Sequence, residues 1–183
     1  MTTARRFCRF NRVDEVTFGM TEFPEGGLCL SAFLILSERG HPDRVLMGHL
    51  NPAAAWDHIG ALDASRTQAH SRGWMLPSSH LMVKESPQEA AARIAQEQLG
   101  LTDLKVADPK VVSEVHSPRR FPDVPDHWDL EFLFRGELPQ GMVPRHAAWT
   151  ELRFVDLATT PKSAIARSHE EVLESAGLRF GGK

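Results

Sequence analysis

The sequence predicts an α/β fold in which helices pack on a mixed β-sheet. Two observations lead to this class: several apolar runs of strand length are interleaved with two or three helical segments, and one helix start is sharply marked near the middle of the chain. The 183 residues are 42% hydrophobic and 25% charged, which is typical of a globular domain. We therefore expect a single domain over residues 1–183.

Charge and cysteine content exclude several protein classes. Lys and Arg total 21 against 24 Asp and Glu, so the net charge is −3. A negatively charged protein does not attract the phosphate backbone of a long nucleic acid, so such a partner is not expected. Cys8 and Cys29 are too far apart for a C-x-x-C motif, which fits a reducing compartment. The apolar runs are too short to span a bilayer or to form an export signal, so no membrane partner is expected. These features predict a cytoplasmic protein.

The first half of the chain predicts a hairpin followed by a helix. Residues 28–36 have the length and apolar content of a strand buried on both faces, which predicts a central place in the sheet. A turn at 39–43 leads to a second strand at 44–50. Asn51-Pro52 is a typical helix start, and residues 53–70 follow as a helix. We treat about 51–72 as a helical insertion whose role the sequence leaves open.

The sharpest local signal is a helix start at Ser86. Ser86 can accept a hydrogen bond from the amide of Glu89, while Glu89 reaches back to Ser86, and Pro87 suits the first helical position. Alanines at 90, 91, 92 and 95 favour continuation of the helix. Gly100 is placed to end it in a left-handed conformation.

The second half predicts three more strands and a last helix. Three segments have the pattern of strands, in which apolar residues alternate with polar ones or follow one another: 110–116, 128–138 and 149–155. Residues 161–176 have the pattern of a helix that Gly177 ends. Strands and helices in this order complete the prediction of a mixed α/β sandwich.

Residues 76–101, LPSSHLMVKESPQEAAARIAQEQLGL, resemble the box of the Nudix hydrolases. That box reads glycine, five residues, glutamate, seven residues, then Arg-Glu-aliphatic-x-Glu-Glu-x-Gly-aliphatic, and here it would span 79–101. The matching residues are Glu85, Arg93, Ala95, Glu97, Gly100 and Leu101. The resemblance implies a Nudix-type α/β/α sandwich with a mixed β-sheet. It also implies hydrolysis of nucleoside diphosphates linked to another moiety, with Mg²⁺ or Mn²⁺ as cofactor.

The departures from the box concern the metal ligands. In the family, three helix glutamates at relative positions i, i+3 and i+4 hold divalent cations, and here these positions carry Ile94, Glu97 and Gln98. Ser79 replaces the box glycine. With one anionic ligand left, we expect weak or absent metal binding and weakened or lost hydrolysis. Two alternatives stay open: a non-catalytic module that binds a nucleotide or another small molecule, and an active hydrolase with replacement ligands.

The resemblance nominates Glu97, Arg93 and Glu85 as catalytic residues and Glu97 as the metal ligand. Glu85 would pair with Arg93 and organise the loop against the helix. Each residue also has a plainer interpretation. The spacing of Glu89, Arg93 and Glu97 is that of a solvated i,i+4 charge ladder, and Glu85 with Arg93 could be a surface ion pair worth about 0 to 1 kcal/mol.

Four further residues are candidates for substrate binding. His80 lies in the loop before the box helix, and Glu131 lies on a predicted strand in a region from which family members recruit an extra acidic ligand or base. Arg119 and Arg120 could clamp phosphates in a proline-bounded loop. The alternatives are a wet strand face for Glu131 and a solvated loop for the arginines. The expected partner is a small nucleotide or other diphosphate-containing ligand, and homodimerisation stays open.

Overall fold

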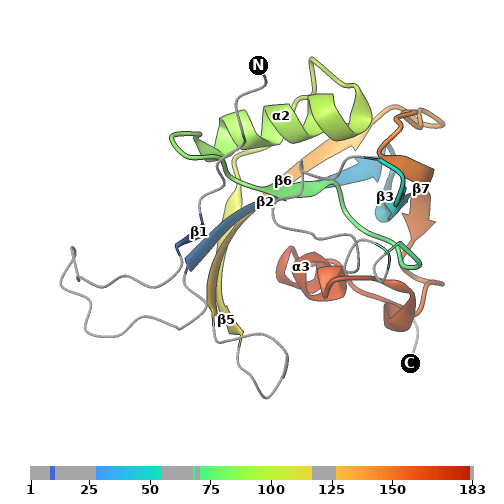
Figure 1. The fold of residues 1–183 in the computed structure, drawn as a ribbon. Coiled ribbons are helices and arrows are strands. Elements are labelled where there is room, and N and C mark those ends of the chain that lie inside the picture. Colours follow the sequence, from blue (N-terminus) through green and yellow to red (C-terminus); the bar gives the residue numbers. More distant parts are fainter. Residues whose placement is uncertain (1–8, 11–27, 55–67, 69–70, 117–126, 182–183) are drawn as a thin grey trace.

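The computed structural model describes residues 9–10, 28–54, 68, 71–116 and 127–181 (Figure 1). It contains seven strands, two α-helices and a 3-10 helix within these ranges. They are β1 (Arg9–Phe10), β2 (Leu28–Glu38), β3 (His41–Leu50), β4 (Ser78–His80), α2 (Pro87–Leu99), β5 (Lys110–His116), β6 (His127–Leu138), β7 (Trp149–Asp156), η2 (Lys162–Ala164) and α3 (His169–Ser175).

The strands form one mixed sheet, as the sequence predicts. The strand order is β5-β6-β2-β3-β7, and β1 and β4 also pair with β2. β2 and β6 run parallel from Leu28 opposite Trp128 to Glu38 opposite Leu138, and the other pairs are antiparallel. The expected central place of the 28–36 strand is therefore confirmed.

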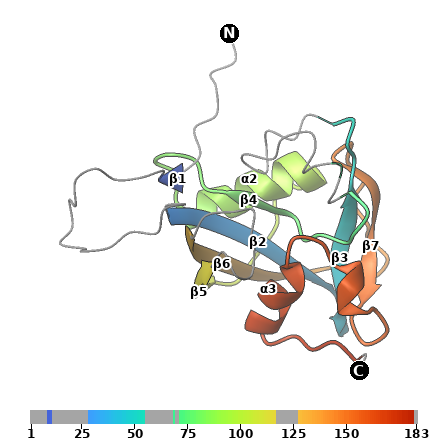
Figure 2. The ribbon, with the colours of Figure 1, turned by 60° about the horizontal axis from the view of Figure 1, so that its bottom comes forward.

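The two α-helices lie on opposite faces of this sheet (Figures 1 and 2). Side chains alternate along β2, so that Ala32 and Leu34 point toward α2 while Phe33 and Ile35 point toward α3. We call these the α2 face and the α3 face. Each face has its own core: the first includes Ala90, Ile94, Leu99 and Phe134, and the second includes Trp74, Leu133, Val172 and Leu173. This arrangement is the predicted α/β/α sandwich.

The predicted capping box at Ser86 is present. The Glu89 amide donates to Ser86 Oγ at 3.2 Å, and the Ser86 amide donates to Glu89 Oε2 at 2.8 Å. Hydrogen bonds from the Ser86 backbone and side chain lower the pKa of the Glu89 carboxyl. Gly100 ends the helix with φ +69°. Local signals therefore mark both ends of α2.

The expected final helix over 161–176 is wrong in its middle. The chain forms η2 and α3 instead, separated by four residues. Ile165 is extended and forms a bridge with Trp74, while Arg167 and Ser168 have φ values of +59° and +57° that interrupt a helix. Pairing with a distant segment has overridden local helix propensity.

The predicted helix over 53–70 falls mostly outside the described residues. Ala53 and Ala54 lie in a turn after β3, in which the Ala53 amide donates to Asn51 Oδ1 at 3.1 Å. Gln68 is helical. No helix in the described part of the chain is long and apolar enough to cross a membrane.

Replacing Ser86 with alanine should destabilise the fold by about 1 kcal/mol, because the backbone amide of Glu89 loses its acceptor, Ser86 Oγ. The pKa of Glu89 should rise only in part, because the backbone amide of Ser86 still donates to its carboxylate. The bond from the Ser86 hydroxyl to this carboxylate lowers the folded-state pKa, so its contribution is present above the unfolded-state pKa and is lost as the pH falls through the folded-state pKa. The difference in urea unfolding between S86A and the parent should thus be largest at neutral pH and narrow in acid. S163A, at an exposed serine of η2, is the control, and an equal effect there would contradict the cap assignment.

Candidate functional site

An ion pair between Glu85 and Arg93 joins the box loop to α2. Arg93 Nε donates to Glu85 Oε1 at 2.7 Å and Arg93 Nη2 donates to Glu85 Oε2 at 2.9 Å. The two side chains are only 8% and 10% exposed, so this is not a solvated surface pair. Glu85 Oε2 also accepts the amide of Met82 at 2.8 Å. The expected pairing is present, and its catalytic role stays a prediction.

Arg93 holds the loop at two further points. Its Nη2 donates to the backbone oxygen of His80 at 2.9 Å, and its Nη1 lies 3.4 Å from Ser79 Oγ. Glu97 Oε2 is 3.6 Å from Arg93 Nη1, one turn further along the helix. The planar guanidinium therefore serves several acceptors at once, which a lysine could not do in this geometry.

Ser79, which replaces the box glycine, lies in β4 opposite Ala32. Its side chain is buried and its backbone does not need positive φ. In this protein, the start of the box is thus regular strand.

Ile94 occupies a ligand position of the box but belongs to the core. Its side chain is fully buried in the α2-face cluster together with Leu34, Leu36 and Phe134. It offers no oxygen to a cation. Its contribution is apolar burial, worth roughly 1.5–3 kcal/mol for a side chain of this size.

Gln98 occupies another ligand position and is also fully buried. Its Nε2 donates to the backbone oxygen of Ser78 at 2.7 Å, and its Oε1 accepts the Ser78 amide at 3.1 Å. We call this pair of bonds the Gln98–Ser78 clamp. A carboxylate can only accept, so a glutamate here would lose the bond to the Ser78 oxygen and face it with a negative charge.

Trp149, on the edge strand β7, contacts the C-terminal end of α2. Trp149 Nε1 donates to the backbone oxygen of Gln98 at 2.8 Å. Its ring packs on Gly48, where an added Cβ would lie 2.4 Å from Trp149 Cε3. Both the backbone and the side chain of Gln98 are therefore hydrogen-bonded to other elements. Sequence analysis did not single out this contact, because it joins residues far apart in the chain.

A sequence model of the NUDIX domain matches residues 57–175, which is more than half of the chain. The chain belongs to the Nudix family. No curated protein sequence matches this Nudix protein.

Solved structures agree with this fold. A MutT protein from Methanosarcina mazei Go1 has a TM-score of 0.55 and 15% identity, covering 85% of this chain and 95% of that one. The dihydroneopterin triphosphate pyrophosphohydrolase of E. coli has a TM-score of 0.53 and 16% identity, covering 80% and 92%. The NUDIX domain of Shewanella oneidensis NrtR, complexed with ADP ribose, has a TM-score of 0.53 and 15% identity, covering 82% and 87%. At these identities the likeness establishes the fold.

The described residues do not fit the three-carboxylate metal site of the family. Ile94 has no donor atom, both polar atoms of the Gln98 side chain bind Ser78, and Glu97 lies beside a guanidinium. No group of three His, Cys, Asp or Glu in the described ranges is arranged to hold a metal ion.

The structure places two of the four candidate substrate residues on strands. His80 lies on β4 and not in the expected loop, because it pairs with Ser31 of β2. Glu131 lies on β6, where it is only 6% exposed. The interpretation of Glu131 as part of a wet strand face is therefore wrong. Glu131 is on the α3 face, two residues before Leu133, so the sheet separates it from Glu97 on α2. Arg119 and Arg120 lie outside the described residues.

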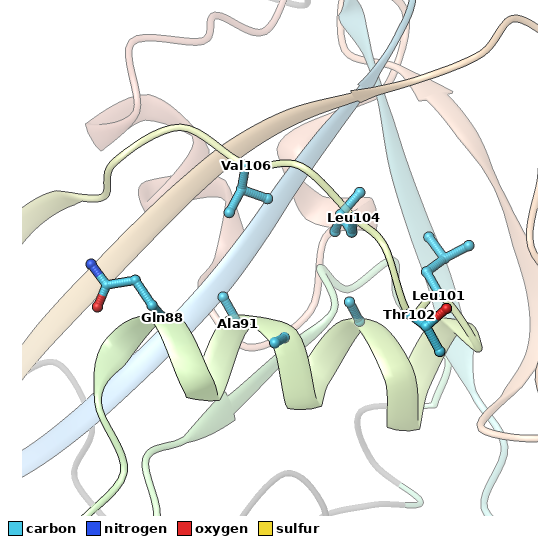
Figure 3. A pocket seen from close by; sticks show the side chains of 8 residues that line it. Gln88, Ala91, Leu101, Thr102, Leu104 and Val106 are labelled. Carbon is cyan, nitrogen blue, oxygen red and sulfur yellow. The ribbon is translucent and has the colours of Figure 1, made fainter.

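A small cavity of about 80 Å³ runs along the other side of α2 (Figure 3). Alanine methyl groups of the helix face Leu104 and Val106 across it, with Gln88 at one end and Thr102 among the lining residues. Glu85, Arg93 and Glu97 do not line it. The cavity is thus separate from the box site.

The Gln98–Ser78 clamp can be tested by truncation. Gln98→Ala leaves the buried amide and carbonyl of Ser78 without these partners, which should cost about 2–4 kcal/mol. Gln96→Ala, at an exposed position of the same helix, should change stability by no more than about 0.5 kcal/mol. Urea unfolding measures both variants. Equal, small effects would contradict a structural role for Gln98.

Proposed function

We propose that this Nudix protein binds a nucleotide or other diphosphate-containing ligand beside its box loop, and that family-type metal-dependent hydrolysis is weakened or lost. The observation that carries the proposal is the Gln98–Ser78 clamp. A residue that would be expected to hold a cation instead holds the strand that precedes the box loop.

The ligand class is supported by the descriptions of similar structures. They include a NUDIX domain complexed with ADP ribose and a dihydroneopterin triphosphate pyrophosphohydrolase. Both ligands contain a phosphoanhydride. The frame of the box loop is retained here through Glu85 and Arg93, which supports retention of a ligand site even where the metal ligands have changed.

The weakened chemistry is supported by charge and by hydrogen bonding. Magnesium gives up its water reluctantly and needs several anionic oxygens or substrate phosphates in exchange. Glu97 is the one carboxylate left of the three, and Arg93 already partly neutralises it. Releasing Gln98 to face a cation would break two buried hydrogen bonds, each worth about 1 kcal/mol net and more if the Ser78 groups were left unsatisfied.

Rebuilding the carboxylates tests whether loss of ligands limits the chemistry. The double variant Ile94→Glu with Gln98→Glu restores the i, i+3, i+4 pattern around Glu97. It should hydrolyse ADP-ribose or another nucleoside diphosphate derivative faster than the parent in Mg²⁺ or Mn²⁺. It should also be less stable without metal, because it buries charge where Ile94 packs.

Metal should raise the melting temperature of this double variant more than that of the parent, because a ligand that binds only the folded state stabilises it. Ala92→Glu with Gln96→Glu is the matched control, since it adds the same charge at exposed positions of the same helix. Calorimetric titration of the parent with ADP-ribose should give binding without turnover. Efficient turnover by the parent that Glu97→Gln abolishes would contradict the proposal and favour an active hydrolase with replacement ligands.

A further inference from the structure

The tip of the box loop is a tight turn that carries a lysine in a position suited to glycine. The amide of Glu85 donates to the backbone oxygen of Met82 at 3.0 Å, which closes a four-residue turn. Lys84, the third residue of this turn, has a φ of +71°, whereas Val83 before it does not have a positive φ. This pattern is that of a type II turn, in which glycine at the third position avoids the steric cost of a side chain.

The turn is fixed from the protein side. The carboxylate of Glu85 accepts the amide of Met82 at 2.8 Å and also binds the guanidinium of Arg93, and both of these charged side chains are nearly buried. Lys84 is therefore held in the left-handed conformation between two anchored residues. This conformation is costly for a residue with a Cβ, and strain of this kind is concentrated at functional sites.

The side chain of Lys84 is available to a ligand. It is exposed, and its ammonium makes no hydrogen bond or ion pair with the part of the chain that the structure describes. Arg93 is the other lysine or arginine of the box, and its guanidinium already binds Glu85 and the backbone of His80. Of these two cations, Lys84 is thus the one that a ligand beside the loop can reach.

A diphosphate ligand needs a cation at this loop. Its phosphates would lie beside Glu97, and like charges repel each other unless a positive charge stands between or next to them. A divalent metal would normally compensate this charge, but the side chains of Ile94 and Gln98 do not fit that metal site. The compensating charge must then come from the protein.

We propose that Lys84 binds a phosphate of the diphosphate ligand and supplies positive charge in place of a metal; this inference rests on the proposed function. An ammonium group offers three hydrogen-bond donors and binds phosphate as a point charge. A lysine kept where glycine would be less strained exchanges some stability for this contact. The fold and the ligand therefore make opposite demands on residue 84.

Three substitutions at this position separate strain from charge. Lys84→Gly removes both, so it should raise the melting temperature by about 2–4 °C while it weakens binding. Lys84→Gln removes only the charge, so it should leave the melting temperature unchanged and weaken binding about 10-fold or more, the loss expected for one charged hydrogen bond. Lys84→Arg keeps the charge and should stay within about 3-fold of the parent affinity.

Calorimetric titration of the full chain with ADP-ribose, in a chelator that removes divalent metals, measures these affinities. Added NaCl should weaken binding by the parent more than binding by Lys84→Gln, because salt screens the ammonium from the phosphate. Lys105→Gln is the matched control, since Lys105 is an exposed lysine between two residues that line the cavity on the other side of α2. It should change neither the affinity nor the melting temperature.

Failure of the inference and failure of the proposed function look different. A Lys84→Gln protein that binds ADP-ribose as tightly as the parent, with the same salt dependence, would overturn the role of Lys84 and leave diphosphate binding in place. A lower melting temperature of Lys84→Gly would overturn the exchange of stability for binding. No binding of ADP-ribose by the parent would contradict the proposed function, and the role of Lys84 would fall with it.

Discussion

The Gln98–Ser78 clamp is the contact on which the site depends. One amide side chain satisfies both the backbone N–H and the backbone C=O of the buried Ser78, at 3.1 and 2.7 Å, and so fixes β4 against the last turn of α2. A carboxylate cannot make this pair of bonds. The same substitution therefore strengthens the scaffold and removes a charge that a cation would need.

The charge that remains is organised around Arg93 instead. Its guanidinium binds both oxygens of Glu85 and the backbone of His80, and it lies 3.6 Å from Glu97. With side-chain exposures of 10% or less, Arg93 and Glu85 are partly desolvated, so each leaves a costly unpaired charge if the other is removed. The guanidinium of Arg93 thus holds the box loop in place.

Sequence patterns predicted the features that local chemistry controls. The start of α2 follows from Ser86 and its end from Gly100, and the strands follow from apolar runs, so the sheet and the sandwich were predictable. The break before α3 was not, because it depends on the pairing of Ile165 with Trp74. The buried position of Gln98 could not be predicted for the same reason. From the sequence, Gln98 is interpreted as a weak metal ligand, because its partner, the backbone of Ser78 on β4, is known only from the structure. Of the site, the sequence predicted the pairing of Glu85 with Arg93. It could not predict that Ser31 lies opposite His80 and Glu131, because this depends on the register of the strands.

Calorimetric titration of Mn²⁺ and Mg²⁺ into the parent protein without nucleotide tests most directly whether the clamp has replaced the metal site. If Gln98 stays bound to Ser78 and Ile94 stays in the core, either ion should bind with a Kd of about 1 mM or weaker, equivalent to about 4 kcal/mol. Gln98→Glu should bind Mn²⁺ more tightly than the parent, because it returns a carboxylate next to Glu97. Micromolar binding by the parent would mean that other residues supply the missing charge, and it would contradict the assignment of Gln98 to a purely structural contact.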